Sequence, residues 1–107
     1  MYSPANNETL TDARSGQIIT NSGATGTRAF NLPHAATGLH FLFALSAAQK
    51  ISVNPQDNDI FIGTGLSPAA GDALESDQAI GTLIEIVAID STNWLQIRKV
   101  GTWTDVN

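Results

Sequence analysis

Few residues of this 107-residue chain have side chains suited to a catalytic or metal site. His34 and His40 are its two histidines, and cysteine is absent, which excludes a thiolate nucleophile and a cysteine-ligated metal. Neither histidine has a carboxylate or second ligand at a spacing typical of metal sites. We therefore expect His34 to lie in a loop and His40 to hydrogen-bond to backbone from a strand.

Serine hydrolase chemistry is also unsupported. The segment Gly65-Leu66-Ser67-Pro68 departs from the G-x-S-x-G turn that exposes a nucleophilic serine in such enzymes. Without that turn, Ser67 and either histidine form no recognisable triad, and we expect no enzymatic activity.

An acidic turn is the one segment that could form a metal site. Asp57 and Asp59 stand beside Asn54 and Asn58, and several hard oxygens in one turn suit calcium. The further ligands, central glycine and terminal glutamate of an EF-hand loop are missing. We expect solvated turn residues and no bound metal or cofactor, with calcium at Asp57 and Asp59 left as an open alternative.

Aromatic side chains offer another alternative. Tyr2, Trp94 and Trp103 could form a platform on which sugar rings stack, as in many β-sandwich carbohydrate-binding modules. Trp94, however, alternates with Gln96 in a segment where one face must be core. We therefore favour packing in the core or at a subunit interface for the two tryptophans.

Composition and charge narrow the class of protein. With 42% hydrophobic and 14% charged residues, the chain has the composition of one folded domain whose surface is mostly small and uncharged. The net charge is −5 and the five basic residues form no stripe, so nucleic acid is not an expected partner. No apolar run approaches the roughly 20 residues of a membrane-spanning helix, so a membrane is not expected either.

The elements that position these residues are predicted to be short strands separated by regular turn signals. Alternation over Leu39–Leu45 indicates a strand with one buried face. The apolar segment Thr82–Ile89 predicts a central strand, followed by a hairpin through Asp90–Asn93 and a last edge strand at Gly101–Thr104. One or two helical turns over Pro68–Gln78 are the only helical alternative. This pattern predicts an all-β fold, an antiparallel β-sandwich or jelly-roll-like barrel.

The polar opening stretch predicts a separate element. Residues 1–16 contain Pro4 and, apart from Tyr2 and Leu10, no large side chain of the core-forming kind. We expect an extended N-terminal arm over 1–16 and a β-sandwich domain over 17–107. Tyr2 and Leu10 would then anchor the arm on a partner surface or a neighbouring subunit.

Several short motifs combine turn residues with core residues. They are Ile19–Thr27 (ITNSGATGT), Phe30–Pro33 (FNLP), Gly38–Phe41 (GLHF), Asn93-Trp94 and Gly101–Trp103 (GTW). Across roughly residues 19–103 the chain resembles small β-modules of bacteriophage virions, which occur in head-decoration, or cement, proteins and in fibre-type proteins. The resemblance implies a structural subunit, commonly trimeric, that binds a capsid lattice or forms part of a fibre.

We therefore expect a non-enzymatic virion protein, foremost a capsid decoration protein that bridges capsomers. Its expected partners are the major capsid protein and two further copies of itself, in a homotrimer on the head surface, after synthesis in the host cytoplasm. Tyr2, Leu10 and Trp103 are the predicted partner-binding residues, because aromatic and large apolar side chains dominate such contacts. A tail-fibre or receptor-binding module is the nearest alternative, and a carbohydrate-binding module is the more distant one.

Overall fold

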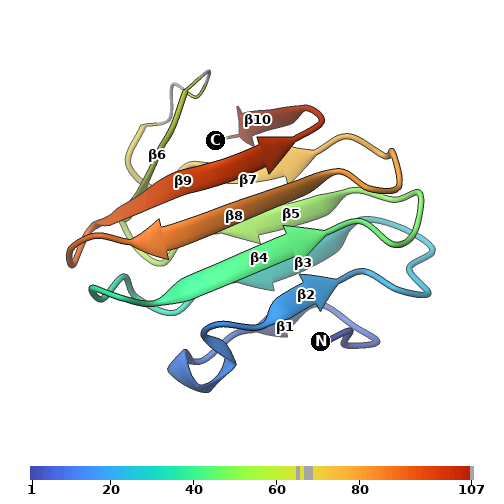
Figure 1. Cartoon of the computed structure of the whole chain (residues 1–107), viewed down its shortest axis with the longest axis horizontal. Helices are drawn as coiled ribbons and strands as arrows, with labels where there is room; N and C mark the ends of the chain where they lie inside the picture. The colour runs from blue at the N-terminus through green and yellow to red at the C-terminus, as the bar shows by residue number, and fades with distance from the viewer. Residues whose placement is uncertain (65, 67–68, 107) are drawn as a thin grey trace.

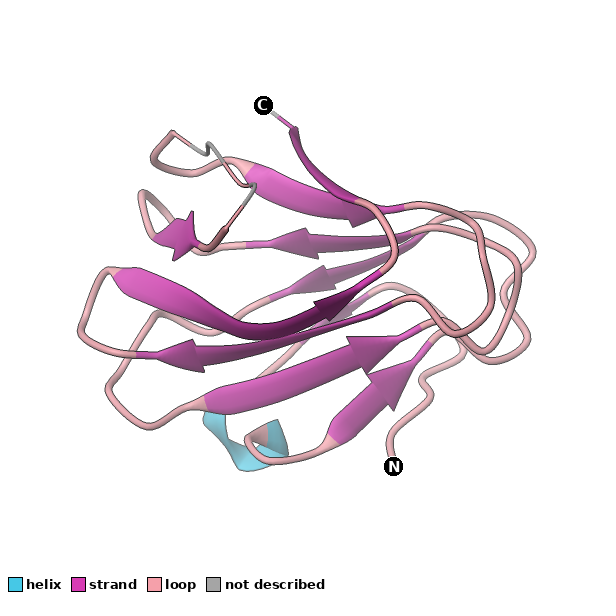
Figure 2. Ribbon diagram, turned by 45° about the horizontal axis from the view of Figure 1, so that its top comes forward, coloured by secondary structure: helices cyan, strands magenta, loops and turns pink. Residues whose placement is uncertain are grey.

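The computed structural model describes residues 1–64, 66 and 69–106, and there ten β-strands form two sheets packed face to face (Figures 1 and 2). None of these residues forms a helix long and apolar enough to cross a membrane. The elements in chain order are β1 (Glu8–Thr9), the 3-10 helix η1 (Asp12–Arg14), β2 (Ile18–Thr20), β3 (Arg28–Asn31), β4 (His40–Ala44), β5 (Ile51–Asn54), β6 (Ile60–Ile62), β7 (Ala73–Ser76), β8 (Leu83–Ala88), β9 (Asn93–Val100) and β10 (Trp103–Val106).

The strand order shows that the sheets are open and mixed. Sheet A has the order β2-β4-β8-β9-β6, and sheet B has the order β1-β3-β5-β7-β10. The predicted all-β sandwich is confirmed, whereas a purely antiparallel arrangement and a closed barrel are wrong. From β1 to β8 the chain alternates between the sheets, and from β1 to β5 each crossing reverses its direction, whereas β7 is antiparallel to β5 and β8 is antiparallel to β4. Two reversals make β1, β3 and β5 parallel, and likewise β2 and β4.

Aromatic rings occupy the space between the sheets. The rings of Phe30 and Phe43 lie 5.5 Å apart between centroids, and Phe41 lies 5.8 Å from Trp94. All four side chains are fully buried, as the alternation in their strands predicts for Phe41, Phe43 and Trp94. The core is thus built from the inward-facing side chains of both sheets.

The predicted β8–β9 hairpin is confirmed, as are the central place of β8 and the edge place of β10. The carboxylate of Asp90 accepts hydrogen bonds from the backbone N–H of Thr92 and of Asn93, each at 2.8 Å. Hydrogen bonds from the Asn93 side chain are the main cause of a lowered Asp90 pKa. The helical alternative is wrong at Ala73–Ser76, which forms β7 between β5 and β10, while Pro68 lies outside the described residues.

Residues 1–16 do not extend away from the sandwich as an arm. Tyr2 pairs with Ile19 at the edge of sheet A, and β1 pairs with β3 at the edge of sheet B. The Arg28 guanidinium donates a hydrogen bond to the Pro4 carbonyl, and Leu10 enters the core. The segment therefore covers the side of the sandwich where the edges of both sheets would otherwise meet water.

Candidate functional site

Three parallel strands of sheet B end at the same side of the molecule. Because β1, β3 and β5 run in one direction, the segments that follow them lie next to each other. Each of these segments has an ionisable residue three positions after the strand's last residue: Asp12 after Thr9, His34 after Asn31 and Asp57 after Asn54. The carboxyl ends of parallel strands are frequent ligand sites in open sheets, and here they surround a hollow.

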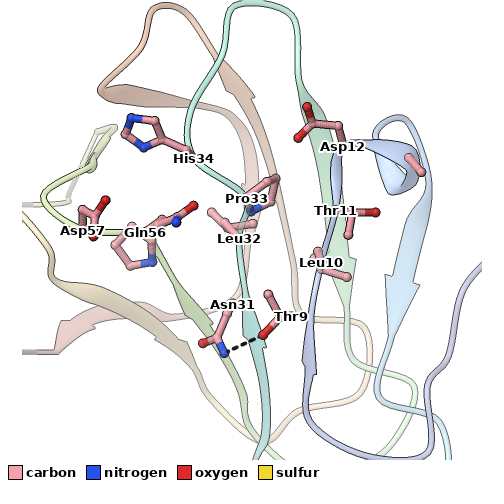
Figure 3. A pocket seen from close by; sticks show the side chains of 12 residues that line it. Thr9, Leu10, Thr11, Asp12, Asn31, Leu32, Pro33, His34, Gln56 and Asp57 are labelled. Atoms are coloured by element: carbon pink, nitrogen blue, oxygen red, sulfur yellow. Dashed lines mark hydrogen bonds between the residues drawn. The ribbon is translucent and has the colours of Figure 1, made fainter.

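This hollow, the strand-end pocket, has a volume of about 790 Å³. In Figure 3 Thr11 and Asp12 lie along one wall, and His34, Gln56 and Asp57 lie along the other. The pocket is lined by Thr9, Leu10, Thr11, Asp12, Ala13, Asn31, Leu32, Pro33, His34, Pro55, Gln56 and Asp57. Its volume falls within the range of small-molecule and side-chain sites.

A buried carboxylate orients the histidine of this pocket. His34 Nδ1 lies 3.0 Å from Asp59 Oδ2, and the same oxygen accepts the backbone N–H of Ala35 at 2.8 Å. Asp59 is 1% exposed, whereas the His34 side chain is 55% exposed. In the neutral imidazole, the proton therefore lies on Nδ1, toward the carboxylate, and Nε2 keeps a lone pair.

Hydrogen bonds between side chains stiffen the strands under the pocket. Asn31 Nδ2 donates to Thr9 Oγ1 at 3.2 Å, and Asn54 Nδ2 donates to Asn31 Oδ1 at 3.0 Å. Ser52 Oγ in turn donates to Asn54 Oδ1 at 3.3 Å. The outer face of sheet B thus carries a polar ladder of small side chains across β1, β3 and β5.

The outer face of sheet A, here called the sheet A face, is apolar. Strand alternation and register determine which residues belong to this face. The face lies toward the viewer in Figure 1. Ile18, Ile62 and Val100 are 43%, 41% and 50% exposed there, and Leu42 is buried without belonging to the core cluster. The apolar members of this face are Ile18, Leu42, Ala44, Ile60, Ile62, Leu83, Val87, Leu95 and Val100.

A charged group interrupts the middle of the sheet A face. Glu85 lies between His40, whose Nε2 is 2.7 Å from Glu85 Oε2, and Arg98, whose Nε is 3.4 Å from Glu85 Oε1. The side chain of His40 thus contacts a carboxylate on the next strand, where we expected backbone. Glu85 thus has the Arg98 guanidinium and the His40 imidazole as neighbours on adjacent strands of this face.

The predicted partner-binding residues contact the protein itself. Leu10 is 2% exposed and Trp103 is 3% exposed, and the Trp103 indole N–H donates to the Leu83 carbonyl at 3.0 Å. The half-buried Tyr2 ring lies under the Arg14 guanidinium, 3.6 Å from it, and its hydroxyl donates to Glu8. This hydrogen bond is the main cause of a raised Tyr2 pKa. In this fold Leu10 and Trp103 have almost no side-chain surface for a partner.

The other predicted chemistry is not assembled. The two indole rings are buried, so the aromatic sugar platform is wrong. Asp57 and Asp59 differ in role, because Asp57 lines the pocket while Asp59 holds His34. No group of three His, Cys, Asp or Glu among residues 1–64, 66 and 69–106 could hold a metal ion. Ser67 lies outside the described residues.

Sequence reasoning missed the strand-end pocket, although a signal was present. The recurring step of three residues from Thr9, Asn31 and Asn54 to an ionisable side chain is visible in the sequence. This spacing indicates a shared site only when β1, β3 and β5 are known to be parallel neighbours.

No protein-family model matches the chain, and no curated protein shows significant sequence similarity to it. The class is therefore defined by the fold and its surfaces. It is an all-β sandwich of two mixed five-stranded sheets with an acidic pocket and an apolar outer face.

Proposed function

We propose that this chain is a non-enzymatic structural protein of a bacteriophage virion, foremost a decoration protein bound to the major capsid protein as a homotrimer on the head. The observation that carries the proposal is the contrast between the two outer faces. Sheet B presents a polar ladder, whereas the sheet A face presents exposed Ile18, Ile62 and Val100. Exposed apolar side chains grouped on one face are typical of contacts with other proteins.

The virion setting rests on the resemblance of residues 19–103, whose motif residues have structural roles in this fold. Asn21 is fully buried, its Oδ1 accepts the backbone N–H of Ser46 at 2.9 Å, and its Nδ2 donates to the Gln49 carbonyl at 2.9 Å. It thereby joins the turn after β2 to the turn after β4. Gly23 has φ 77°, a conformation that favours glycine.

The proposed mechanism is mechanical. A subunit that spans adjacent capsomers adds contact area across joints of the shell. That area raises the free energy needed to rupture the shell under the pressure of packaged DNA. No covalent step is involved.

Binding to phage heads tests this proposal. Expanded and unexpanded heads of the phage that encodes the chain are incubated with increasing protein, and bound protein is measured after sedimentation. We expect saturable binding to expanded heads and much weaker binding to unexpanded ones. Absence of binding to both would overturn the decoration role.

A fibre or receptor-binding module is the second candidate, and the strand-end pocket is the observation that favours it. Saturable binding to host-cell surfaces, combined with no binding to heads, would support that alternative. A carbohydrate-binding role through stacked tryptophans is not retained, because Trp94 and Trp103 are in the core.

A further inference from the structure

The strand-end pocket is rich in hydrogen-bond acceptors. The carboxylates of Asp12 and Asp57 accept only, and His34 offers the Nε2 lone pair because its Nδ1 faces Asp59. No lysine or arginine is among the residues that line the pocket in the described chain. A ligand that brings donors therefore fits these groups. Among the described residues neither carboxylate forms an ion pair, so both oppose the binding of an anion.

The positions of these acceptors do not favour a small ion as the ligand. Figure 3 shows Asp12 on the wall opposite His34 and Asp57, with Leu32 and Pro33 between them. The acceptors are thus spread around an apolar floor instead of converging on one point. This arrangement suits an extended side chain whose stem lies on the floor and whose charged end reaches a wall.

The apolar surfaces distinguish a guanidinium from an ammonium ion and from a sugar. Pro33 and Pro55 give apolar surfaces, and the guanidinium group is more weakly hydrated than an ammonium ion, so it loses less hydration when it lies against them. A lysine ammonium is more strongly hydrated and has fewer donors. Among the described residues that line the pocket there is no Phe, Tyr or Trp, the side chains on which sugar rings commonly stack.

We propose that the strand-end pocket binds the guanidinium group of an arginine side chain presented by a partner protein. The group donates hydrogen bonds to the Asp57 carboxylate and to His34 Nε2, while Asp59 holds the imidazole in the accepting orientation. The protein's net charge of −5 favours the approach of such a cationic partner. The site needs an exposed arginine only, so it does not depend on the virion proposal.

The probe that tests this proposal is Nα-acetyl-arginine amide, and its neutral control is the corresponding citrulline amide. Both are titrated into ¹⁵N-labelled protein, and amide chemical shifts are followed by NMR. A ligand of this size is expected to bind with a dissociation constant of about 1 mM. We expect saturable shifts at His34, Gln56 and Asp57 with the arginine probe and none with the citrulline probe.

Two substitutions distinguish binding in the pocket from nonspecific attraction of the cationic probe to an acidic protein. Asp57→Asn removes the charge and keeps a residue that tolerates the positive φ of 53° at this position. We expect it to weaken arginine binding at least about tenfold, whereas Asp105→Asn, on strand β10 at the far edge of sheet B, leaves binding unchanged. The spectra also report whether each variant is folded.

Three results would overturn the assignment. They are equal shifts with citrulline amide, unchanged affinity in Asp57→Asn, and shifts at the pocket with neutral oligosaccharides but not with the arginine probe. Head binding tests the virion proposal separately, so failure of one leaves the other standing.

Discussion

The Asp77 carboxylate joins two parts of the chain through three hydrogen bonds. Thr82 Oγ1 donates to Asp77 Oδ1 at 2.6 Å, the Ala79 N–H donates to the same oxygen at 2.9 Å, and the Thr102 N–H donates to Oδ2 at 3.0 Å. These bonds, foremost the one from Thr82, lower the Asp77 pKa below its ordinary 3.8. They favour the charged form and connect the turn before β8 to the turn before β10.

This geometry predicts a pH-dependent contribution to stability. A lowered folded-state pKa stabilises the fold above the unfolded-state pKa, and that contribution is lost as pH falls through the folded-state value. Asp77→Asn should therefore lower the melting temperature at about pH 7, and its difference from the wild type should shrink toward about pH 2.5. Thermal unfolding across this range measures it, with Asp105→Asn as control. A difference that stays constant with pH would contradict this role.

At the scale of elements, the segment over residues 1–16 is an integral part of the sandwich. Leu10 follows β1 directly, its N–H donates to the Asn31 carbonyl at 2.8 Å, and its side chain is in the core. Truncation of a buried leucine to alanine removes contacts and leaves a cavity. The stability of the whole domain should therefore depend on this segment.

Leu10→Ala is expected to cost about 2 to 5 kcal/mol in the free energy of unfolding. Ile80→Ala is the matched control, since that side chain is 67% exposed and its loss should change stability by less than about 0.5 kcal/mol. Urea denaturation of both variants gives the comparison. Equal, small effects would mean that the segment leaves the sandwich in solution, as an arm would.

The elements also show what could be predicted from the sequence. Period-2 alternation identified the buried faces at Phe41 and Phe43, and the turn at Asp90–Asn93 identified the hairpin. Strand β1 could not be predicted, because two residues, Glu8 and Thr9, are too few to show a period. The parallel pairs were missed because local patterns mark strands and turns but do not say to which sheet the next strand belongs.

The site depended even more on tertiary structure. His34 was placed correctly in a loop, but its partner Asp59 lies 25 positions later and meets it only through the packing of the two sheets. Trp103 was predicted to bind a partner because aromatic side chains dominate such contacts, yet its indole N–H donates to the Leu83 carbonyl on the other sheet. Exposure at such positions is decided by contacts distant in sequence.

At the scale of the whole molecule, the unequal outer faces predict how copies associate. If the sheet A face is the contact between subunits, charged side chains placed on it should prevent association, because they would have to be buried without partners. Ile62→Lys combined with Val100→Lys puts two charges on this face, where both native side chains are exposed. The matched control, Ser52→Lys with Thr104→Lys, puts two charges on the outer face of sheet B.

Light scattering coupled to size-exclusion chromatography measures the mass of each form across a range of concentrations. The wild type and the sheet B control should form the trimer at high concentration, and the sheet A variant should stay at the monomer mass of 11.3 kDa. Circular dichroism checks that all three remain folded. A trimer that survives the sheet A substitutions but is lost in the sheet B control would reverse the assignment. The apolar face would then be free to contact the capsid, with the polar ladder between subunits.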